Sequence, residues 1–467
     1  MINKFLSNKF FPISLKLISL VAFIGLMIIG FSSHSEDAAI LMELRNTNLA
    51  NLFVWSYWWP LIVLAAIFFG RVWCMVCPVE LITAFFARIG LKKKRPKWIL
   101  SGWGITIFYS FILIVGINIF AIHRNPAYMA TYLTTIIIVS IFIGLIYEKN
   151  TFCRYVCPVG NLLGLYSKLS FFGWRVKNTN VCDSCKDKSC IHKDHIYNFN
   201  YKSCGVDLYP AKIKDNSQCI LCAGCLKTCK EYQSKQNPLR PNPAFIKTGF
   251  AKDLFQIEPL SLAEFFFLFV VSGFVIYEIL SEYSTAEKIL LFVPTFFTQY
   301  FSIENSIIKI LFQCTFLFLI VPSILWFFPY LILRLSKIKI SILNYLKNFC
   351  LIFIPIIIAA HFDKAILKTT SRLPYIENAF KDVRGMNTAN AIINNQMVVS
   401  KIPTWAENLI SLILLSALIG GFILSYKVIT KLIIKYQIES AKWILYIISF
   451  LYFLIFFLDI IFWRFLS

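Results

Sequence analysis

The sequence predicts a polytopic α-helical membrane protein with about nine transmembrane helices and a small polar insert after the fourth of them. Three observations support this fold class. The 467 residues are 58% hydrophobic and only 15% charged. Apolar runs of about 20 residues recur, and a helix of that length crosses the roughly 30 Å hydrocarbon core of a bilayer. A single polar stretch, from Val181 to Lys230, holds eight of the 14 cysteines.

Nine apolar segments have the length of a transmembrane helix. They comprise residues 11–31, 49–70, 99–122, 127–147, 260–280, 307–333, 343–366, 406–429 and 443–463. Segment 292–301 would change this count if it re-entered the membrane.

The charge of the chain, +22, is concentrated in alternate loops, as the positive-inside rule requires. We therefore interpret it as membrane topology, and no nucleic-acid partner is expected. The N-terminus and the polar insert are predicted to be cytoplasmic, in a multi-pass protein of the bacterial inner (cytoplasmic) membrane.

The first four helices form two related hairpins. The motifs CMVCP and CRYVCP place one cysteine pair, Cys74 and Cys77, and a second pair, Cys153 and Cys157, at the inner ends of helices, each pair directly before a proline. Such a duplication would bring the four thiols together on the cytoplasmic side. The predicted domains are thus the duplicated hairpins, the insert and a C-terminal bundle of about five spans. Their boundaries are 1–177, 178–252 and 253–467.

The insert carries the most specific motif of the chain, CxxCxxCxxxC from Cys219 to Cys229. Thiolates three residues apart in a tight loop can reach three corners of one [4Fe–4S] cubane, and in two-cluster ferredoxins the fourth cysteine ligates the other cluster. The insert is therefore predicted to be ferredoxin-like, with two [4Fe–4S] clusters. Cluster 1 would be held by set 1, Cys182, Cys185, Cys190 and Cys229. Cluster 2 would be held by set 2, Cys204, Cys219, Cys222 and Cys225.

Set 1 departs more than set 2 from the bacterial spacing. Four residues separate Cys185 from Cys190, thirteen separate Cys190 from Cys204, and Lys230 replaces the usual proline. Zinc sites also use CxxC pairs, and a secreted protein could form four disulfides. Iron–sulfur clusters are preferred because the run crowds four thiols more than tetrahedral zinc requires, and because a cytoplasmic location favours free thiolates.

The cysteines of the hairpins are candidates for a third redox centre, either a metal or cluster site or a reversible dithiol pair. We call them the membrane set, Cys74, Cys77, Cys153 and Cys157. The alternative is that they are small buried residues beside a helix-breaking proline. Two lone cysteines in apolar helices, Cys314 and Cys350, are expected to be core residues.

Two histidines near the outer face are candidate quinol or haem residues. His361 lies within a predicted span and His123 at an outer turn, and neutral imidazole can ligate a b-type haem or accept protons from a quinol. For His123 a structural place in a polar turn competes with this role. His192 and His195 flank set 1 without the spacing of Rieske ligation, and they are expected to be solvated.

The doubled cysteine–proline motif and the two-cluster segment resemble the membrane ferredoxin-type proteins of the NapH/NosR group, over roughly residues 10–245. The resemblance implies electron transfer between a quinone pool or cytoplasmic donor and a respiratory or periplasmic acceptor. It also implies partners such as quinone, a soluble ferredoxin-type protein or a periplasmic cytochrome. The chain would then be the electron-transfer subunit of an oxidoreductase, similar to quinol dehydrogenases.

Two other functions remain open at this point. The clusters could supply electrons for maturation of a respiratory metalloenzyme, or the additional C-terminal helices could form a transporter with a redox-sensing insert. No Walker loop, GxGxxG motif, catalytic triad or HExxH motif occurs, so hydride chemistry by this chain alone is not expected.

Overall fold

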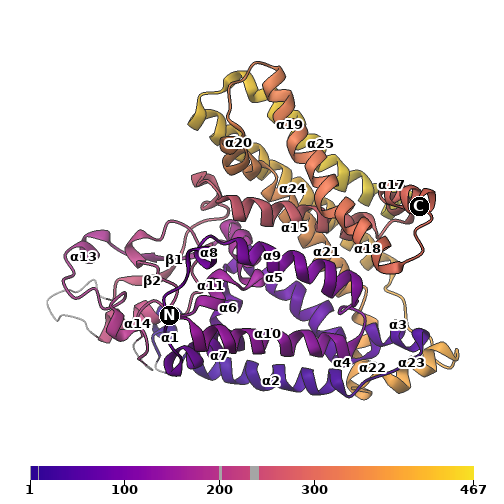
Figure 1. The fold of residues 1–467 in the computed structure, drawn as a ribbon, viewed down its shortest axis with the longest axis horizontal. Coiled ribbons are helices and arrows are strands. Elements are labelled where there is room, and N and C mark those ends of the chain that lie inside the picture. Colours follow the sequence, from indigo (N-terminus) through magenta and orange to yellow (C-terminus); the bar gives the residue numbers. More distant parts are fainter. Residues whose placement is uncertain (1, 9, 199–201, 232–240, 467) are drawn as a thin grey trace. The chain divides into compact units, whose positions relative to one another are not determined.

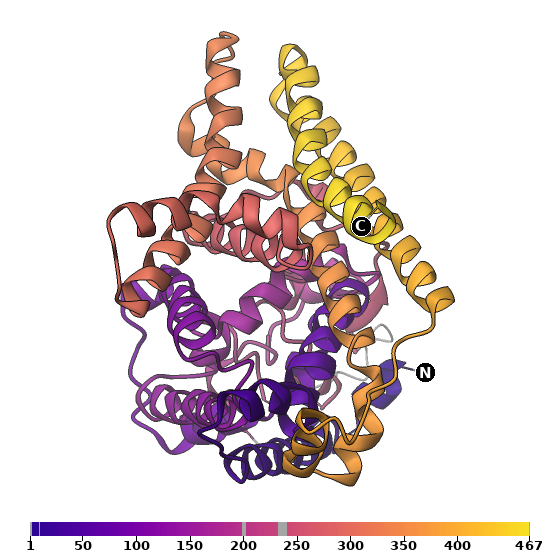
Figure 2. The ribbon, with the colours of Figure 1, turned by 90° about the vertical axis from the view of Figure 1, so that its right-hand side faces the viewer.

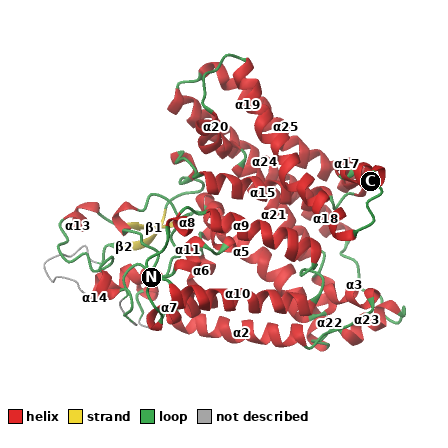
Figure 3. Cartoon of the chain, viewed as in Figure 1, coloured by secondary structure: helices red, strands yellow, loops and turns green. Residues whose placement is uncertain are grey.

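The computed structural model describes residues 2–8, 10–198, 202–231 and 241–466, which are mostly helical with a two-stranded sheet (Figure 3). These residues fall into two compact units. Unit 1 comprises Met1–His34, Leu61–Ile105 and Pro126–Leu254. Unit 2 comprises Ser35–Pro60, Thr106–Asn125 and Phe255–Ser467. All the cysteines of set 1, set 2 and the membrane set belong to unit 1, and both candidate quinol histidines belong to unit 2.

In the part of the chain that the structure describes, seven helices are long and apolar enough to cross a membrane. They are Ile13–Phe31, Leu49–Phe69, Pro126–Ile146, Leu262–Leu280, Ser306–Leu335, Thr404–Tyr436 and Glu439–Leu466. An eighth span results if the pair Ile342–Ile352 and Ile354–Lys381, bent by 44°, is taken as one. The multi-pass helical fold is confirmed.

The expected count of nine is not confirmed. The predicted third span, residues 99–122, contains only the shorter apolar helix Trp103–Ile119. The turn before it is formed by Gly102, whose φ is +82°, and the turn after it contains Ala121, whose φ is +48°. The segment suspected of re-entry forms α17 (Phe292–Tyr300), whose 9 residues are too short to span a bilayer.

Unit 1 is built on the packing of α2 (Ile13–Phe31), α7 (Pro78–Ile89) and α10 (Pro126–Ile146), which lie side by side in Figure 1. Small residues permit this close approach. A Cβ atom added to Gly144 of α10 would lie 3.0 Å from the carbonyl oxygen of Thr83 in α7. Membrane helices associate in this way because lipid provides little hydrophobic driving force between them.

The two cysteine–proline motifs have the same local structure. The helix α5 (Trp59–Phe69) leads through α6 (Val72–Val76) into α7, and α10 leads through α11 (Thr151–Tyr155) into α12 (Pro158–Tyr166). In both cases a cysteine is the N-cap and proline is the first helical residue, where its missing N–H costs no hydrogen bond.

An antiparallel ribbon brackets the insert. Its strands are β1 (Phe172–Val176) and β2 (Pro243–Lys247), with Trp174 opposite Phe245. The N-terminal helix α1 (Ile2–Leu6) is tied to this ribbon, because the Asn3 side chain accepts from the N–H of Phe245 at 2.8 Å and donates to its carbonyl at 3.2 Å. Between the strands lie α13 (Thr179–Asp183) and α14 (Gly224–Glu231).

Unit 2 is a bundle around α15 (Leu262–Leu280), α21 (Ile354–Thr370), α24 (Thr404–Tyr436) and α25 (Lys442–Ile461). Figure 2 shows α24 and α25 running side by side. Their contact is secured by the hydroxyls of Ser425 and Ser449, 2.7 Å apart and fully buried. Interhelical hydrogen bonds of this kind are typical of membrane bundles.

Candidate redox site

The membrane set lies where helices begin. Cys77 and Cys157 are the N-cap residues of α7 and α12, and the N–H of Gly160 donates to Sγ of Cys157 at 3.3 Å. A helix N-terminus favours negative charge, so these are good positions for thiolate ligands. Burial, assisted by neighbouring thiols, nevertheless raises the pKa of Cys77 to about 12 and that of Cys157 to about 11. Without a bound metal or cluster both thiols would therefore be protonated at neutral pH.

The structure brings the four members of the membrane set together. Burial raises the pKa of Cys153 well above its usual value. Electrostatic interactions with Cys157, Cys77 and Cys74 raise it further. The two hairpins thus place their cysteine pairs within electrostatic range of each other.

Set 2 surrounds one cavity. Its four cysteines line a space of about 350 Å³, part of which is open to solvent. The other residues that line it are almost all apolar, and they include Trp174, Val206, Leu208, Pro210 and Ile213. Four thiols converging on one apolar space fit a [4Fe–4S] cluster, whose bulk must be enclosed and whose corners each need a thiolate.

The loop of set 2 is wound by two left-handed residues. Leu221 has φ of +55° and Ala223 has φ of +57°, a conformation that costs a non-glycine residue roughly 1 kcal/mol or more. This winding turns three successive cysteines of the run toward the same cavity. Burial raises the pKa of Cys219 to about 12, with the thiols of Cys222 and Cys204 adding to the effect.

Hydrogen bonds reach two sulfur atoms of set 2. The indole Nε1 of Trp174 donates to Sγ of Cys225 at 2.9 Å, and the N–H of Leu208 approaches Sγ of Cys204 at 3.4 Å. Such N–H donors stabilise the negative charge of metal-bound thiolates and tune the reduction potential of clusters.

Set 1 is also assembled from distant parts of the insert. Burial raises the pKa of Cys190 to about 12, and the next contributions come from Cys229, Cys182 and Cys185. Cys229 therefore lies within electrostatic range of Cys190. The side-chain amide of Asn242 donates to Sγ of Cys182 at 3.0 Å.

Sets 1 and 2 are neighbours. The N–H of Cys204 in set 2 donates to the carbonyl of Cys190 in set 1 at 2.8 Å. None of the 14 cysteines, all of which lie in described segments, is joined in a disulfide. Among the described residues, no three metal-binding side chains lie close enough to hold a single metal ion.

Glu80 is a buried charged residue that the sequence analysis missed. Its side chain is 2% exposed and binds Lys16, Lys202 and the amide of Asn150. Although burial opposes ionisation, the two lysines lower the pKa of Glu80 below its usual value. The available signal was the position of a carboxylate three residues after Cys77, on a helix that is otherwise mostly apolar.

Three arginines of the hairpins dock the insert. Arg71 donates to the carbonyl of Ser217 at 2.8 Å, and Arg88 donates to the carbonyl of Asn198 at 3.1 Å. Arg95 pairs with Asp207 at 2.5 Å. These residues therefore do more than determine membrane topology, because each joins the first domain to the insert.

The candidate histidines lie among aromatic rings of unit 2. His361 is buried in α21, with the rings of Trp59 and Phe274 each 6.5 Å away, and His123 lies 6.5 Å from the ring of Trp55. Burial, with a smaller effect of nearby cations, lowers the pKa of His123 to about 3, so this imidazole is neutral.

The remaining candidates have the expected environments or nearly so. His192 is exposed, and its Nδ1 lies 3.5 Å from a carboxylate oxygen of Asp194. His195 is partly buried and its Nδ1 lies 3.2 Å from the amide of Asn198. Cys314 and Cys350 are buried.

Among known families, the matching model covers parts of the duplicated hairpins. The family described as "4Fe-4S binding domain" matches residues 51–97 and again residues 129–180, which together make up less than half of the chain. Each range contains one cysteine–proline motif, so the two matches support the duplication. No solved structure matches the chain.

Three curated relatives are similar over parts of their length. Two are uncharacterized proteins of Methanocaldococcus jannaschii. MJ0749 is 25% identical over a region that covers 36% of this chain and 65% of MJ0749. MJ0750 is 28% identical over a region that covers 36% of this chain and 73% of MJ0750. The third is the methylamine utilization ferredoxin-type protein MauN of Paracoccus denitrificans, 27% identical over 25% of this chain and 46% of its own. This chain thus spans just under two thirds of the first relative and less than half of MauN. Together these findings support a ferredoxin-like 4Fe–4S protein with a multi-pass membrane fold.

Proposed function

We propose that this chain carries electrons between a quinone pool or cytoplasmic donor and a respiratory or periplasmic acceptor, as a membrane protein of the NapH/NosR type. The observation that carries the proposal is the cavity in which the four thiols of set 2 converge. The two matches to a 4Fe-4S binding domain and the similarity to a ferredoxin-type protein support the same class.

Two [4Fe–4S] clusters would be held by set 1 and set 2, and each would supply a site that accepts and releases one electron. The chain's own residues prepare these sites. Trp174 donates to a sulfur of set 2, Asn242 donates to a sulfur of set 1, and apolar side chains limit the access of water. The membrane set would provide a third redox site, as a metal or cluster site or as a dithiol.

The proposed orientation places the insert and the N-terminus in the cytoplasm of a bacterium. Two features support it. Lys and Arg are concentrated in the loops predicted to be inside. In addition, Asn3 of α1 is hydrogen-bonded to β2 of the insert, which requires both to be on one side of the membrane.

A quinol site in unit 2 is the least direct part of the proposal. It is supported by the buried imidazole of His361 beside two aromatic rings. His123 is a weaker candidate for accepting a quinol proton, because burial lowers its pKa to about 3. An optical spectrum of the purified protein would separate this role from haem ligation, because a b-type haem absorbs strongly in the visible region.

The central experiment is analysis of the protein purified without oxygen. Iron and acid-labile sulfide are expected in amounts that correspond to at least two [4Fe–4S] clusters, with a cubane EPR signal after reduction. Stoichiometric zinc without such a signal would refute the proposal. A deletion strain that keeps its electron transfer but contains an immature respiratory metalloenzyme would instead favour the role in maturation.

A further inference from the structure

Arg71 occupies an unusual position between two of the cysteine sets. It follows the left-handed Gly70 in the turn between α5 and α6, three residues before Cys74, and it is only 4% exposed. Its guanidinium donates to the carbonyl of Ser217, two residues before Cys219. One side chain thus connects the first hairpin to the loop of set 2.

The same guanidinium lies against the second hairpin. A Cβ atom added to Gly160 would be 2.8 Å from Nη2 of Arg71 and 3.6 Å from Sγ of Cys157. The glycine of the CRYVCPVGN segment therefore leaves the space into which the guanidinium fits. Arg71 therefore lies beside Gly160 and near Cys157 of the second hairpin while it is bonded to the segment that precedes set 2.

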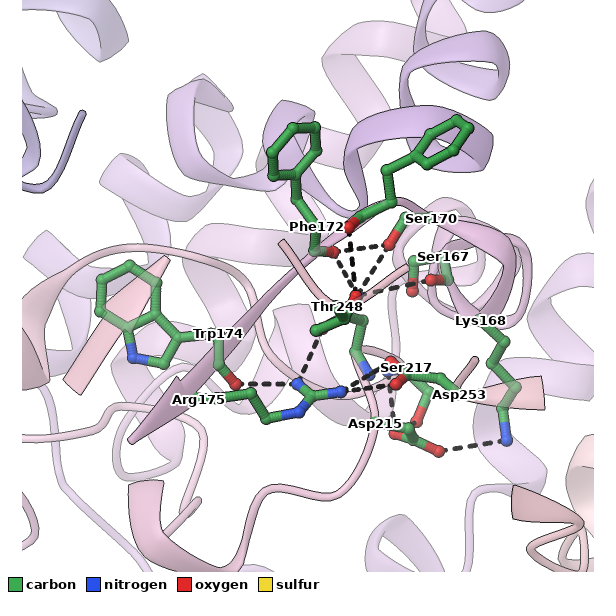
Figure 4. Close-up of polar contacts among 12 residues, drawn as sticks. Ser167, Lys168, Ser170, Phe172, Trp174, Arg175, Asp215, Ser217, Thr248 and Asp253 are labelled. Carbon is green, nitrogen blue, oxygen red and sulfur yellow. Dashed lines mark hydrogen bonds and ion pairs between the residues drawn. The ribbon is translucent and has the colours of Figure 1, made fainter. Parts of the chain in front are cut away.

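The carbonyl that accepts from Arg71 is held in place by a polar network (Figure 4). The N–H and hydroxyl of Ser217 both donate to Asp215, at 3.0 Å and 2.6 Å, and Asp215 in turn pairs with Lys168 at 3.2 Å. Nearby, Arg175 binds both carboxylate oxygens of Asp253, at 2.7 Å and 2.8 Å. The Arg71 contact is therefore made to an ordered segment of the insert.

Arg71 is more deeply buried than Arg175 and Arg95 of unit 1, and its charge partners differ from theirs. Arg175 pairs with Asp253 and Arg95 pairs with Asp207. In the part of the chain that the structure describes, no carboxylate pairs with Arg71, and its largest attractive interactions are with Cys74, Cys157 and Cys219. A buried guanidinium remains charged and needs a compensating negative charge. Cysteines that carry a metal cluster are anionic and would supply it.

We propose that Arg71 is a positioning residue that holds set 2 and the membrane set side by side and compensates the negative charge of their metal-bound thiolates. This inference rests on the proposed function. Reduction adds one electron, and so one negative charge, to a centre. A nearby fixed cation stabilises the reduced state more than the oxidised state, and thereby raises the reduction potential.

The test compares Arg71→Met with Arg71→Lys in the full-length protein, with Arg95→Met as a matched control that also removes an arginine docking the insert. Iron content and EPR-monitored redox titration are the readouts, and a Cys219→Ser variant identifies the signal of set 2. For Arg71→Met we expect at least a tenfold shift toward the oxidised state at a given potential, which is about 59 mV for a one-electron couple. Arg71→Lys retains the positive charge, so its reduction potential should stay close to that of the wild-type protein. Arg95→Met should leave the potential unchanged.

Unchanged potentials in an Arg71→Met protein with full iron content would overturn the inference, as would an equal shift in Arg95→Met. If Arg71→Met loses iron, retention of iron in Arg71→Lys supports the role of the charge, and equal loss in both variants overturns it. Gly160→Ala keeps the charge but displaces the guanidinium, so an intermediate shift is expected, and wild-type potentials would argue against a positioning role. Absence of cluster signals from the wild-type protein would instead refute the proposed function itself.

Discussion

The Nζ atom of Lys202 lies 3.0 Å from Oε1 of Glu80. This ion pair joins the insert, two residues before Cys204, to the first turn of α7, three residues after Cys77. The second oxygen of the carboxylate binds Lys16 of α2, which is 3% exposed. One buried carboxylate therefore connects the first transmembrane helix, the first cysteine–proline motif and the insert.

Glu80→Gln should destabilise the protein strongly. The substitution leaves the buried Lys16 and the partly buried Lys202 without their counter-charge, and loss of one partner from a buried ion pair costs about 3–5 kcal/mol. Denaturant-induced unfolding in detergent, followed by tryptophan fluorescence, would measure the loss. The control is Glu377→Gln, which breaks an exposed pair with Lys381 and should leave the free energy of unfolding almost unchanged. Equal effects of the two variants would contradict the structural role of Glu80.

The docking of the insert should weaken in acid because of Asp207. Although burial alone would raise the pKa of this carboxyl, hydrogen bonds and charges of Arg95 and Lys149 lower it below its usual 3.8. A group whose pKa is lower in the folded state contributes stability above its unfolded pKa, and this contribution is lost as the pH falls through the folded pKa. The contribution should therefore be complete above about pH 5 and decline below about pH 4.

Thermal unfolding of the wild-type protein and of Asp207→Asn, measured from pH 3 to pH 7, checks this expectation. The variant should be less stable at neutral pH, and the difference between the two proteins should shrink as the pH falls. A difference that grows toward low pH would have the wrong sign and would reject the assignment.

The arrangement of apolar runs predicts most of the membrane fold, but it does not reveal where a run is interrupted. Residues 99–122 look continuous, yet the backbone turns at Gly102 and Ala121 shorten the helix at both ends. The helix predicted at 343–366 is broken before Pro355, because proline cannot donate the hydrogen bond that would continue it. Such breaks depend on local backbone geometry, which the average hydropathy of a segment does not report.

The cysteine run of the insert could be recognised from the sequence because its spacing is local, whereas the division of the eight cysteines into two sets remains a prediction. The run from Cys219 to Cys229 follows from the reach of a tight loop. In contrast, the partners of Glu80 are 64 and 122 residues distant in sequence, and Arg71 is 146 residues from Ser217. No periodicity or motif relates such residues, so these contacts emerge only from the tertiary structure.

Replacing cysteines one at a time should separate the two clusters. Cys219→Ser is expected to lower the iron content by about half if it removes the cluster of set 2, and Cys190→Ser should do the same for set 1. Cys229→Ser should abolish the EPR signal that Cys190→Ser abolishes, rather than the signal that depends on Cys219. Cys350→Ala, at a buried cysteine of unit 2, should leave the iron content unchanged. Loss of the set 2 signal in Cys229→Ser would show that the fourth cysteine belongs to its own run.

Trp174→Phe should lower the reduction potential of the centre at set 2 without removing its iron. The indole of Trp174 is 1% exposed and donates to Sγ of Cys225 at 2.9 Å, whereas phenylalanine keeps an aromatic ring but has no N–H group. An N–H donor stabilises a sulfur more when the centre is reduced and more negative, so its removal favours the oxidised state.

The expected shift is smaller than that for Arg71→Met, because a neutral donor is lost rather than a full charge. It should not exceed about tenfold in the ratio of the two states, ~59 mV for a one-electron couple. EPR-monitored titration measures it, and Trp326→Phe, which alters an equally buried tryptophan of unit 2, serves as the control. A Trp174→Phe protein with full iron content and the wild-type potential would show that the indole packs against Cys225 without tuning it.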